Sequence, residues 1–488
     1  MSVVENSEAF GYNRSCAFML IVKKGKGVLM RRKYIGDRSF YKMVLAVAIP
    51  IMIQNGITNF VSLLDNIMVG QVGTEQMSGV AIVNQLVFVY FLCMFGGLSG
   101  AGIFTAQYYG QKNDEGIRRT FRYKLWLGVI LTVTATAILW FGGRQLIGLY
   151  LGGQADGGSP EAALMYGMGY LRITLLGFPA FLLLQVYAST LRECAETVVP
   201  MKAGIAAVLV NLVFNYLLIF GSFGFPRLGV NGAAWATVIS RYVEMGIVVW
   251  FMHTHKKTHT YAEGLYRTLR IPLELVRKYF VTGFPLLLNE TLWSAGMAVL
   301  SQCYSMRGLN VVAGQNIANT INSVFNIMMI AMGDAVAIIV GQLLGSGKFE
   351  EARDTDTKII AFTVASSAVV GVLMFLTAPL FPRIYNTTEE ARRIAMHFLM
   401  AYAVFMPQVG FLHTTYFTLR SGGKTVITFI FDSVFMWVVS VPLAYILSRY
   451  TGIYVVWIFV ALTIAEWIKC VIGFVMVKKG VWINNIVA

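Results

Sequence analysis

Charged residues are scarce in this chain. Asp, Glu, Lys and Arg together make up 13% of its 488 residues, whereas hydrophobic residues make up 57%, and the mean hydropathy is +0.65. Soluble domains carry about 25% charged residues, because water must solvate their surface. The composition therefore excludes an ordinary soluble domain and indicates an integral membrane protein.

Cysteine and the motifs of enzyme chemistry are scarce as well. The five cysteines are scattered, at Cys16, Cys93, Cys194, Cys303 and Cys470. This spacing fits neither a metal site nor a disulfide framework. The glycine-rich stretch 152–159 lacks the lysine and the preceding strand of a phosphate-binding loop. With no catalytic constellation and no soluble sensing domain, the sequence indicates neither an enzyme nor a receptor.

Long uncharged runs are what the chain has instead. Residues 76–111 and 308–333, for example, contain no charged residue, and each exceeds the roughly 18 residues that suggest a membrane span. Such runs must be helical, because hydrocarbon offers unpaired backbone groups no water to bond. Dividing the runs at Gly, Pro and charge clusters predicts twelve transmembrane helices, at residues 42–70, 77–106, 123–143, 161–190, 200–222, 232–254, 279–306, 314–343, 358–380, 393–418, 425–448 and 453–477.

The two halves of the chain repeat one another. Pro50 and Asn84 recur 235 positions later as Pro285 and Asn319. The same offset relates Gly73, Gly79, Gln107 and Gly110 to Gly308, Gly314, Gln342 and Gly345. Six helices per half return the chain to its starting side, so both halves have the same orientation. We therefore expect an all-α integral membrane fold, in which two pseudo-symmetric six-helix bundles face a central cleft, as in transporters.

The predicted helices divide the chain into two lobes, a linker and two tails. The lobes are residues 42–254 and 279–478, and the tails are residues 1–41 and 479–488. The linker, residues 255–278, is rich in Lys, Arg and His. We expect it to be a cytoplasmic tether between the lobes, either with some amphipathic helix on the inner leaflet or as a plain connector.

The net charge of +15 is unevenly distributed along the chain. If the N-terminus is cytoplasmic, the tails and loops on that side carry 29 Lys or Arg residues, and the opposite loops carry seven. This asymmetry follows the positive-inside rule, so we expect a plasma (inner) membrane protein with both termini in the cytoplasm. The excess of basic residues then reflects orientation in the membrane and contact with anionic lipid, not nucleic-acid binding.

Asp65 stands out among the ionisable residues of the predicted helices. An ionisable side chain in lipid costs at least about 2.5 kcal/mol, and Asp65 has no basic residue within one helical turn. Asn211 and Asn215 lie one turn apart on one helix face. At about 1.5 Å per residue, Asp65, Asn215 and Thr237 all lie roughly 9 to 16 Å below the outer surface. The four residues are therefore predicted to share a layer.

These four side chains offer one carboxylate, two amides and a hydroxyl. Such an oxygen cage suits a hard monovalent cation such as Na⁺, and a lone carboxylate could equally bind a proton. The structural alternatives are an interhelical hydrogen bond for the two asparagines and a capping role for Asp65.

The second half departs from the repeat at this point, because Leu300 stands at the position equivalent to the acid. Glu290 and Asp334 instead lie about 18 to 21 Å from the inner surface, near the midplane. They are candidates for a second cation or substrate site, with structural hydrogen bonding as the alternative for Asp334. Asp432 and His413 lie shallower, and the sequence assigns them no role.

Several segments together resemble one known family. They are Pro50, Leu64–Gly70, Gln107–Gly110, Asn211–Gly221, Gly232–Ser240 and Val340–Gly345. From about residue 39 to residue 478 the chain is similar to multidrug and toxic compound extrusion (MATE) transporters, of the multidrug/oligosaccharidyl-lipid/polysaccharide flippase superfamily. Any one segment is a weak signal, but the set is specific.

The resemblance implies an antiporter that exports organic cations, drugs or toxic metabolites in exchange for Na⁺ or H⁺, by alternating access. It implies a coupling site at Asp65, Asn211, Asn215 and Thr237, and a bend of the first helix at Pro50. Some members carry aspartate at the place of Asn215, and an acid at a position that is Val409 here.

The resemblance implies no cofactor beyond the coupling ion. We expect a monomer in the lipid bilayer, with a small-molecule substrate and no nucleic-acid partner. The alternative function is a lipid-linked saccharide flippase of the same superfamily. That function would require a cleft lined by basic residues, whereas Arg and Lys are sparse within the predicted helices.

Overall fold

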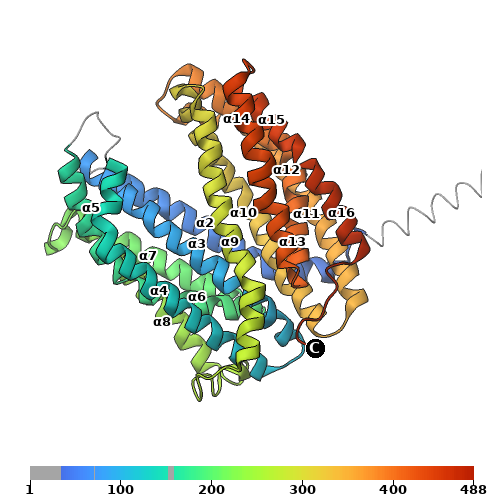
Figure 1. Cartoon of the computed structure of the whole chain (residues 1–488). Helices are drawn as coiled ribbons and strands as arrows, with labels where there is room; N and C mark the ends of the chain where they lie inside the picture. The colour runs from blue at the N-terminus through green and yellow to red at the C-terminus, as the bar shows by residue number, and fades with distance from the viewer. Residues whose placement is uncertain (1–33, 71, 152–158) are drawn as a thin grey trace, which may run out of the picture.

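The computed structural model describes residues 34–70, 72–151 and 159–488, and these residues form a helical protein (Figure 1). The first half contains α2 (Arg38–Gly70), α3 (Thr74–Gly110), α4 (Asp114–Leu151), α5 (Pro160–Leu175), α6 (Phe178–Glu193), α7 (Val198–Phe220) and α8 (Val230–Thr254). The second half contains α9 (Leu273–Ser305), α10 (Leu309–Gly345), α11 (Phe349–Thr377), α12 (Glu389–Ser421), α13 (Thr425–Phe429), α14 (Val441–Tyr450), α15 (Val455–Ala465) and α16 (Trp467–Lys479). Two π-helical turns, η4 (Ile430–Val434) and η5 (Met436–Ser440), connect α13 to α14. Most of the predicted tail 1–41 lies outside the described residues.

The predicted all-α membrane fold is confirmed. Each predicted membrane helix coincides with one of these helices or with a run of consecutive ones. Within the described residues, nine of the predicted spans are long and apolar enough to cross a membrane. Helices α5 and α6 together form a tenth span, which bends by 47°. Pro179 lies in the first turn of α6, where its missing N–H breaks the continuity of that span. The other two of the twelve predicted spans correspond to α8 and α9, which carry ionisable residues within them.

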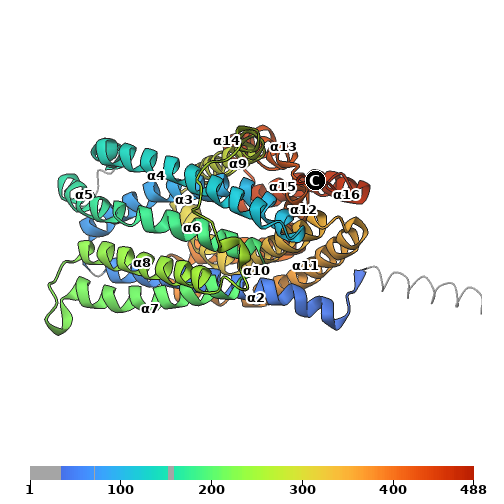
Figure 2. The ribbon, with the colours of Figure 1, turned by 90° about the horizontal axis from the view of Figure 1, so that it is seen from below.

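The two halves form a V-shaped molecule (Figure 1). Helices α4 to α8 gather in one bundle and α11 to α16 in the other. The bundles diverge toward the end that carries the turn between α14 and α15, which we call the far end. They meet at the end that carries residues 255–272, which we call the linker end. Seen from below, α2 starts beside α11 and runs across to the first bundle (Figure 2).

The first turns of α2 and α9 pack in the opposite bundle. Val44, Val47, Ala48 and Ile51 of α2 belong to a buried cluster whose other buried residues all come from the second half. Tyr279, near the start of α9, belongs to the buried cluster of the first half. Its ring lies 4.7 Å from the ring of Phe104 on α3 and 5.3 Å from that of Tyr123 on α4. This exchange ties the two lobes together at the linker end.

Helices α3 and α10 touch through their backbones where each carries the repeated Gln-x-x-Gly. A Cβ atom on Gly110 would overlap the carbonyl group of Gln342, and a Cβ atom on Gly345 would overlap that of Gln107. Only glycine permits this approach, because it has no side chain. The repeat therefore marks a pseudo-symmetric contact between the two lobes.

The two glutamines also bond across the lobes. Gln107 Nε2 donates to the carbonyl of Ser421 at 2.9 Å, and Gln342 Nε2 donates to the carbonyl of Glu193 at 2.9 Å. Residues 484–486 join the same contact, since the amide of Ile486 donates to Gln107 Oε1 at 2.9 Å. The segment after α16 thus lies against both lobes.

The linker does not form the predicted amphipathic helix. Residues 255–272 contain only the single 3-10 turn η2 (Thr260–Ala262), and α9 begins at Leu273, inside the range predicted as linker. The amphipathic helix is therefore wrong for residues 255–272, and the plain connector agrees with the structure. Side chains of α4 bind linker carbonyls that a helix would need for its own bonds.

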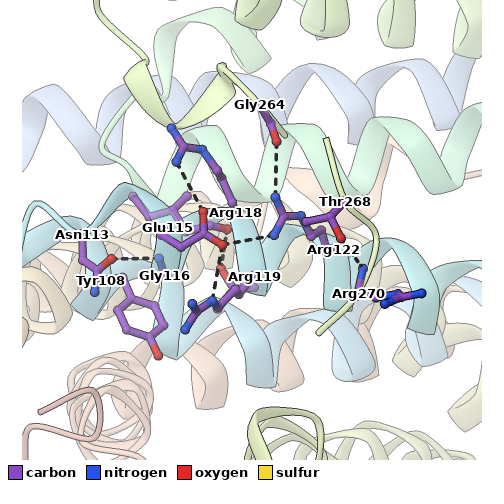
Figure 3. A network of polar contacts seen from close by, with 12 residues as sticks. Tyr108, Asn113, Glu115, Gly116, Arg118, Arg119, Arg122, Gly264, Thr268 and Arg270 are labelled. Carbon is purple, nitrogen blue, oxygen red and sulfur yellow. Dashed lines mark hydrogen bonds and ion pairs between the residues drawn. The ribbon is translucent and has the colours of Figure 1, made fainter. Parts of the chain in front are cut away.

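Two arginines of α4 hold the linker in place. Arg118, Arg119 and Arg122 surround the carboxylate of Glu115, with N···O distances of 3.2 to 3.4 Å (Figure 3). Arg118 and Arg122 also donate, at 3.1 to 3.2 Å, to the carbonyls of Thr260, Tyr261, Gly264 and Leu265. The linker is therefore a docked strap and not a separate helix.

Candidate functional site

The structure brings the four predicted residues of the first lobe together. Asp65 lies on α2, Asn211 and Asn215 on α7, and Thr237 on α8. Helix α7 packs against both α2 and α8, and its two asparagines, four residues apart, face these neighbours. The predicted layer therefore exists as a set of side chains from three helices.

A continuous chain of polar contacts links the four side chains. Asn215 Nδ2 donates to Asp65 Oδ1 at 2.5 Å and to Asn211 Oδ1 at 2.9 Å. Asn211 Nδ2 donates to Thr237 Oγ1 at 3.4 Å. Asn215 is the centre of this group, because it alone touches both the carboxylate and the other amide.

The group has one negative charge and an unused acceptor. The side chain of Asn215 is 0% exposed, and its Oδ1 atom has no hydrogen-bond partner among the described residues. Arg241 is occupied with Glu244, at 2.9 Å. Within the described part of the chain no three His, Cys, Asp or Glu side chains converge. The group can thus offer one carboxylate and neutral oxygens to a small cation or a proton.

The second-lobe candidates are not joined into one site. Glu290 lies on α9, and its Cγ atom would be 3.1 Å from a Cβ atom on Gly96 of α3. Asp334 lies on α10. Among the described residues no hydrogen bond or ion pair connects these two acids. Their predicted function as a second site stays a prediction.

A polar cluster next to Glu290 was not predicted. Asn289 Nδ2 donates to Asp432 Oδ2 at 3.0 Å and to the Tyr416 hydroxyl at 3.3 Å. Ser433 Oγ donates to Asn289 Oδ1 at 2.6 Å. The signal in the sequence was a second polar residue, Asn289, beside an acid in an apolar helix. The cluster gives Asp432 a hydrogen-bonding role.

Arg420 is the other residue that sequence reasoning missed. Its side chain is 6% exposed, and its guanidinium carbon lies 5.2 Å from the ring centre of Phe417 and 5.9 Å from that of Phe95 on α3. Its Nη1 atom is buried without a hydrogen-bond partner among the described residues. The sequence placed Arg420 just past a predicted helix, where a lysine or arginine is expected to be solvated. His413 lies beside the same Phe417 ring, at 6.0 Å.

Helix α2 passes through Pro50 without ending. Because proline has no N–H, the carbonyl of Ala46 loses its helical partner. The Thr197 hydroxyl, at the start of α7, donates to that carbonyl at 3.4 Å. The freed group is thus satisfied by a neighbouring helix, and the bend at Pro50 stays a prediction.

Known proteins are similar to this chain in sequence or in structure. The multidrug resistance protein PmpM of Pseudomonas aeruginosa is 27% identical over 418 residues, which cover 84% of each chain. The probable multidrug resistance protein YoeA of Bacillus subtilis is 24% identical over 431 residues, which cover 86% of this chain and 90% of the relative. A crystal structure of a MATE protein in complex with MaL6 superposes with a TM-score of 0.79, at 22% identity, over 92% of this chain and 97% of its own.

A model of a protein family also matches both halves of the chain. The model, described as MatE, matches residues 50–217 and, in the second half, residues 285–446. The two matches begin at Pro50 and Pro285, the first pair of the repeat seen in the sequence. Together they cover more than half of the chain, so this protein belongs to the MatE family of multidrug and toxic compound extrusion membrane transporters.

Proposed function

We propose that this protein exports small organic molecules, such as cationic drugs and toxic metabolites, in exchange for Na⁺ or H⁺. One observation carries the proposal, namely the continuous chain of contacts from Asp65 through Asn215 and Asn211 to Thr237. The names of the relatives, which are multidrug resistance proteins, support the class of substrate.

The coupling ion binds at Asp65 in this proposal. A Na⁺ ion takes the carboxylate and the neutral oxygens of the group in place of its water shell, whereas a proton forms an O–H bond on the carboxylate. Either ion neutralises the single negative charge. A divalent ion would leave an excess positive charge in a low-dielectric layer, which is costly.

In this proposal, a movement of α2 links ion binding to the substrate path. This helix carries Asp65 near the far end, packs along α10, and has its first turns in the second-lobe core. A shift of α2 on ion binding therefore acts on both lobes and favours a rocking motion about the linker end. One charge that moves through about 100 mV supplies about 2.3 kcal/mol, enough for a gradient of roughly fifty-fold.

The linker end faces the cytoplasm in this proposal, because the basic loops gather there. The V-shaped arrangement of Figure 1 then has its lobes apart on the outer side, where the substrate leaves and the ion enters. The protein acts as a monomer in the inner membrane. The comparisons do not favour the alternative of a saccharide flippase.

Asp65→Asn tests the proposed function. We expect the variant to insert and fold normally but to lose ion-driven dye export by at least tenfold, because an amide binds neither ion as a carboxylate does. The measurement is fluorescent-dye export from proteoliposomes under imposed Na⁺ or pH gradients.

Asp354→Asn is the matched control for this substitution. Asp354 is an exposed acid near the start of α11 that pairs with Lys358, so its loss should leave export unchanged. Export by Asp65→Asn at the wild-type rate under both gradients would remove Asp65 from the mechanism.

A further inference from the structure

Asp356 is a buried carboxyl group that the exchange at Asp65 does not use. It lies on α11, seven residues after Phe349, and its side chain is 0% exposed. Thr418 Oγ1 on α12 lies 2.6 Å from Asp356 Oδ1 and 2.9 Å from the carbonyl oxygen of Thr414, and its single hydrogen serves one of the two at a time. The other oxygen, Oδ2, is buried and has no hydrogen-bond partner among the described residues.

The hydroxyl groups along the same interface do not reach this oxygen. Thr363 on α11 donates to the carbonyl of Ile359, and Thr414 on α12 donates to that of Gly410. Both bonds return to the helix that carries the threonine, as is usual within helices. Thr418 is therefore the one donor to Asp356 in the described part of the chain.

The cations on the surrounding helices are engaged elsewhere. On α11, Arg353 donates to the carbonyl of Lys478, and Lys358 pairs with Asp354. On α12, the charged and titratable groups near this level are Arg420 and His413, which lie beside the Phe417 ring. Helix α10 carries no Lys or Arg, and Arg38 and Lys42 of α2 and Lys478 and Lys479 of α16 are exposed. No ion pair with Asp356 forms among the described residues.

We propose that Asp356 is a proton-binding residue of the second lobe. The proton forms an O–H bond on Oδ2 while the linker end is closed, as it is here, and leaves to water when that end opens. An ionised carboxylate would lie in a low-dielectric interior with a single neutral donor, whereas the neutral acid leaves only one hydroxyl unpaired, which costs less. Na⁺ does not fit, because the carboxyl group and one hydroxyl are too few ligands.

Its depth fits release at the linker end. Seven residues from the start of α11 correspond to about 10 Å, whereas Asp65 lies near the opposite end of the other lobe. The inference rests on the proposed function for its place in a transport cycle, since only alternating access would expose Asp356 to water. Its protonation can nevertheless be measured without transport.

Infrared difference spectroscopy of the full chain in lipid nanodiscs tests the proposal. We expect a carboxylic-acid C=O band in the wild type that is lost in Asp356→Asn and retained in Asp65→Asn. Thr418→Val should keep the band but shift its frequency, since it removes the one hydrogen bond to this carboxyl group. The Thr418→Val variant also decides the question if Asp356→Asn does not fold.

A transport measurement separates a proton-binding role from a structural one. In proteoliposomes, acidification on the linker side should slow wild-type dye export severalfold, because Asp356 cannot then release its proton, and Asp356→Asn should lose this dependence. Infrared spectra of the wild type and Asp356→Asn that do not differ in a carboxylic-acid band would overturn the proposal. So would an unchanged band position in Thr418→Val. If neither the wild type nor any variant exports dye, the proposed function is wrong, but the infrared result on Asp356 still stands.

Discussion

At the scale of single residues, Asn215 holds the first-lobe group together. Its amide nitrogen bonds both Asp65 and Asn211, whereas Thr237 joins the group through one longer contact to Asn211. A hydrogen bond to a charged group contributes about 1.5 to 3 kcal/mol, and one between neutral groups about 0.5 to 1.5 kcal/mol. The four residues should therefore contribute unequally to ion binding.

We expect Asn215→Ala to weaken binding of the coupling ion by about ten- to a hundredfold, because it frees the carboxylate of Asp65 from its fixed position. Thr237→Val should weaken binding by less than about tenfold. Isothermal titration of the purified protein with Na⁺, or proton uptake in unbuffered detergent, measures the difference. An equal effect of the two substitutions would mean that Asn215 is not the centre of the group.

At the scale of helices, α4 and α6 are joined by a buried ion pair. Lys124 on α4 is fully buried and pairs with Glu193 on α6, whose side chain is 16% exposed. Lys124 Nζ also donates to Ser189 Oγ at 3.2 Å and to Thr190 Oγ1 at 3.3 Å. All partners of the buried cation thus come from one neighbouring helix, so the pair fixes how α6 lies on α4.

We expect Lys124→Met to lower the free energy of unfolding by about 3 kcal/mol. This is the lower end of the range of about 3 to 5 kcal/mol for the loss of one partner of a buried ion pair, because Glu193 is partly exposed and can be solvated. The double variant Lys124→Met with Glu193→Gln should recover part of this loss, since no buried charge is left alone. The apparent melting temperature in detergent reports both. Lys358→Met, which removes a partly exposed pair with Asp354, is the control and should cost less than about 1 kcal/mol.

At the scale of the whole molecule, the linker end holds the lobes together. Gln107 and Gln342 each bond a backbone carbonyl of the opposite lobe, and the first turns of α2 and α9 pack in the opposite core. The proposed alternating access would require that contacts at this end loosen. The two glutamines are therefore expected to set the balance between the conformations.

We expect Gln107→Ala with Gln342→Ala to shift this balance by at least about tenfold toward opening at the linker end. The two bonds between the lobes, of about 0.5 to 1.5 kcal/mol each, are lost together with the bonds of Gln107 to residues 484 and 486. Spin labels would then report a shorter distance in a cysteine-free background if placed at Phe223, between α7 and α8, and at Leu309, the first residue of α10. Both residues are highly exposed at the far end of opposite lobes. Ser346→Ala, at the same end but bonded only to its own helix, should leave the distance unchanged.

The sequence by itself determined the membrane fold and the first-lobe group. Long uncharged runs can only be helical in lipid, and the repeat from Pro50 to Pro285 fixed two like bundles. Asp65, Asn211, Asn215 and Thr237 could be predicted to share a layer because depth along straight helices follows from residue counting alone.

The tertiary structure decided whatever depends on which helices are neighbours. The docked linker, the cluster around Asn289, the buried Arg420 and the lone carboxyl of Asp356 all depend on contacts between different segments of the chain. Residue spacing reports depth and helix face, but it does not report the partner on the other side of that face. The sequence therefore told which residues are polar at a given depth, and only the packing decided which of them are satisfied and which are left alone.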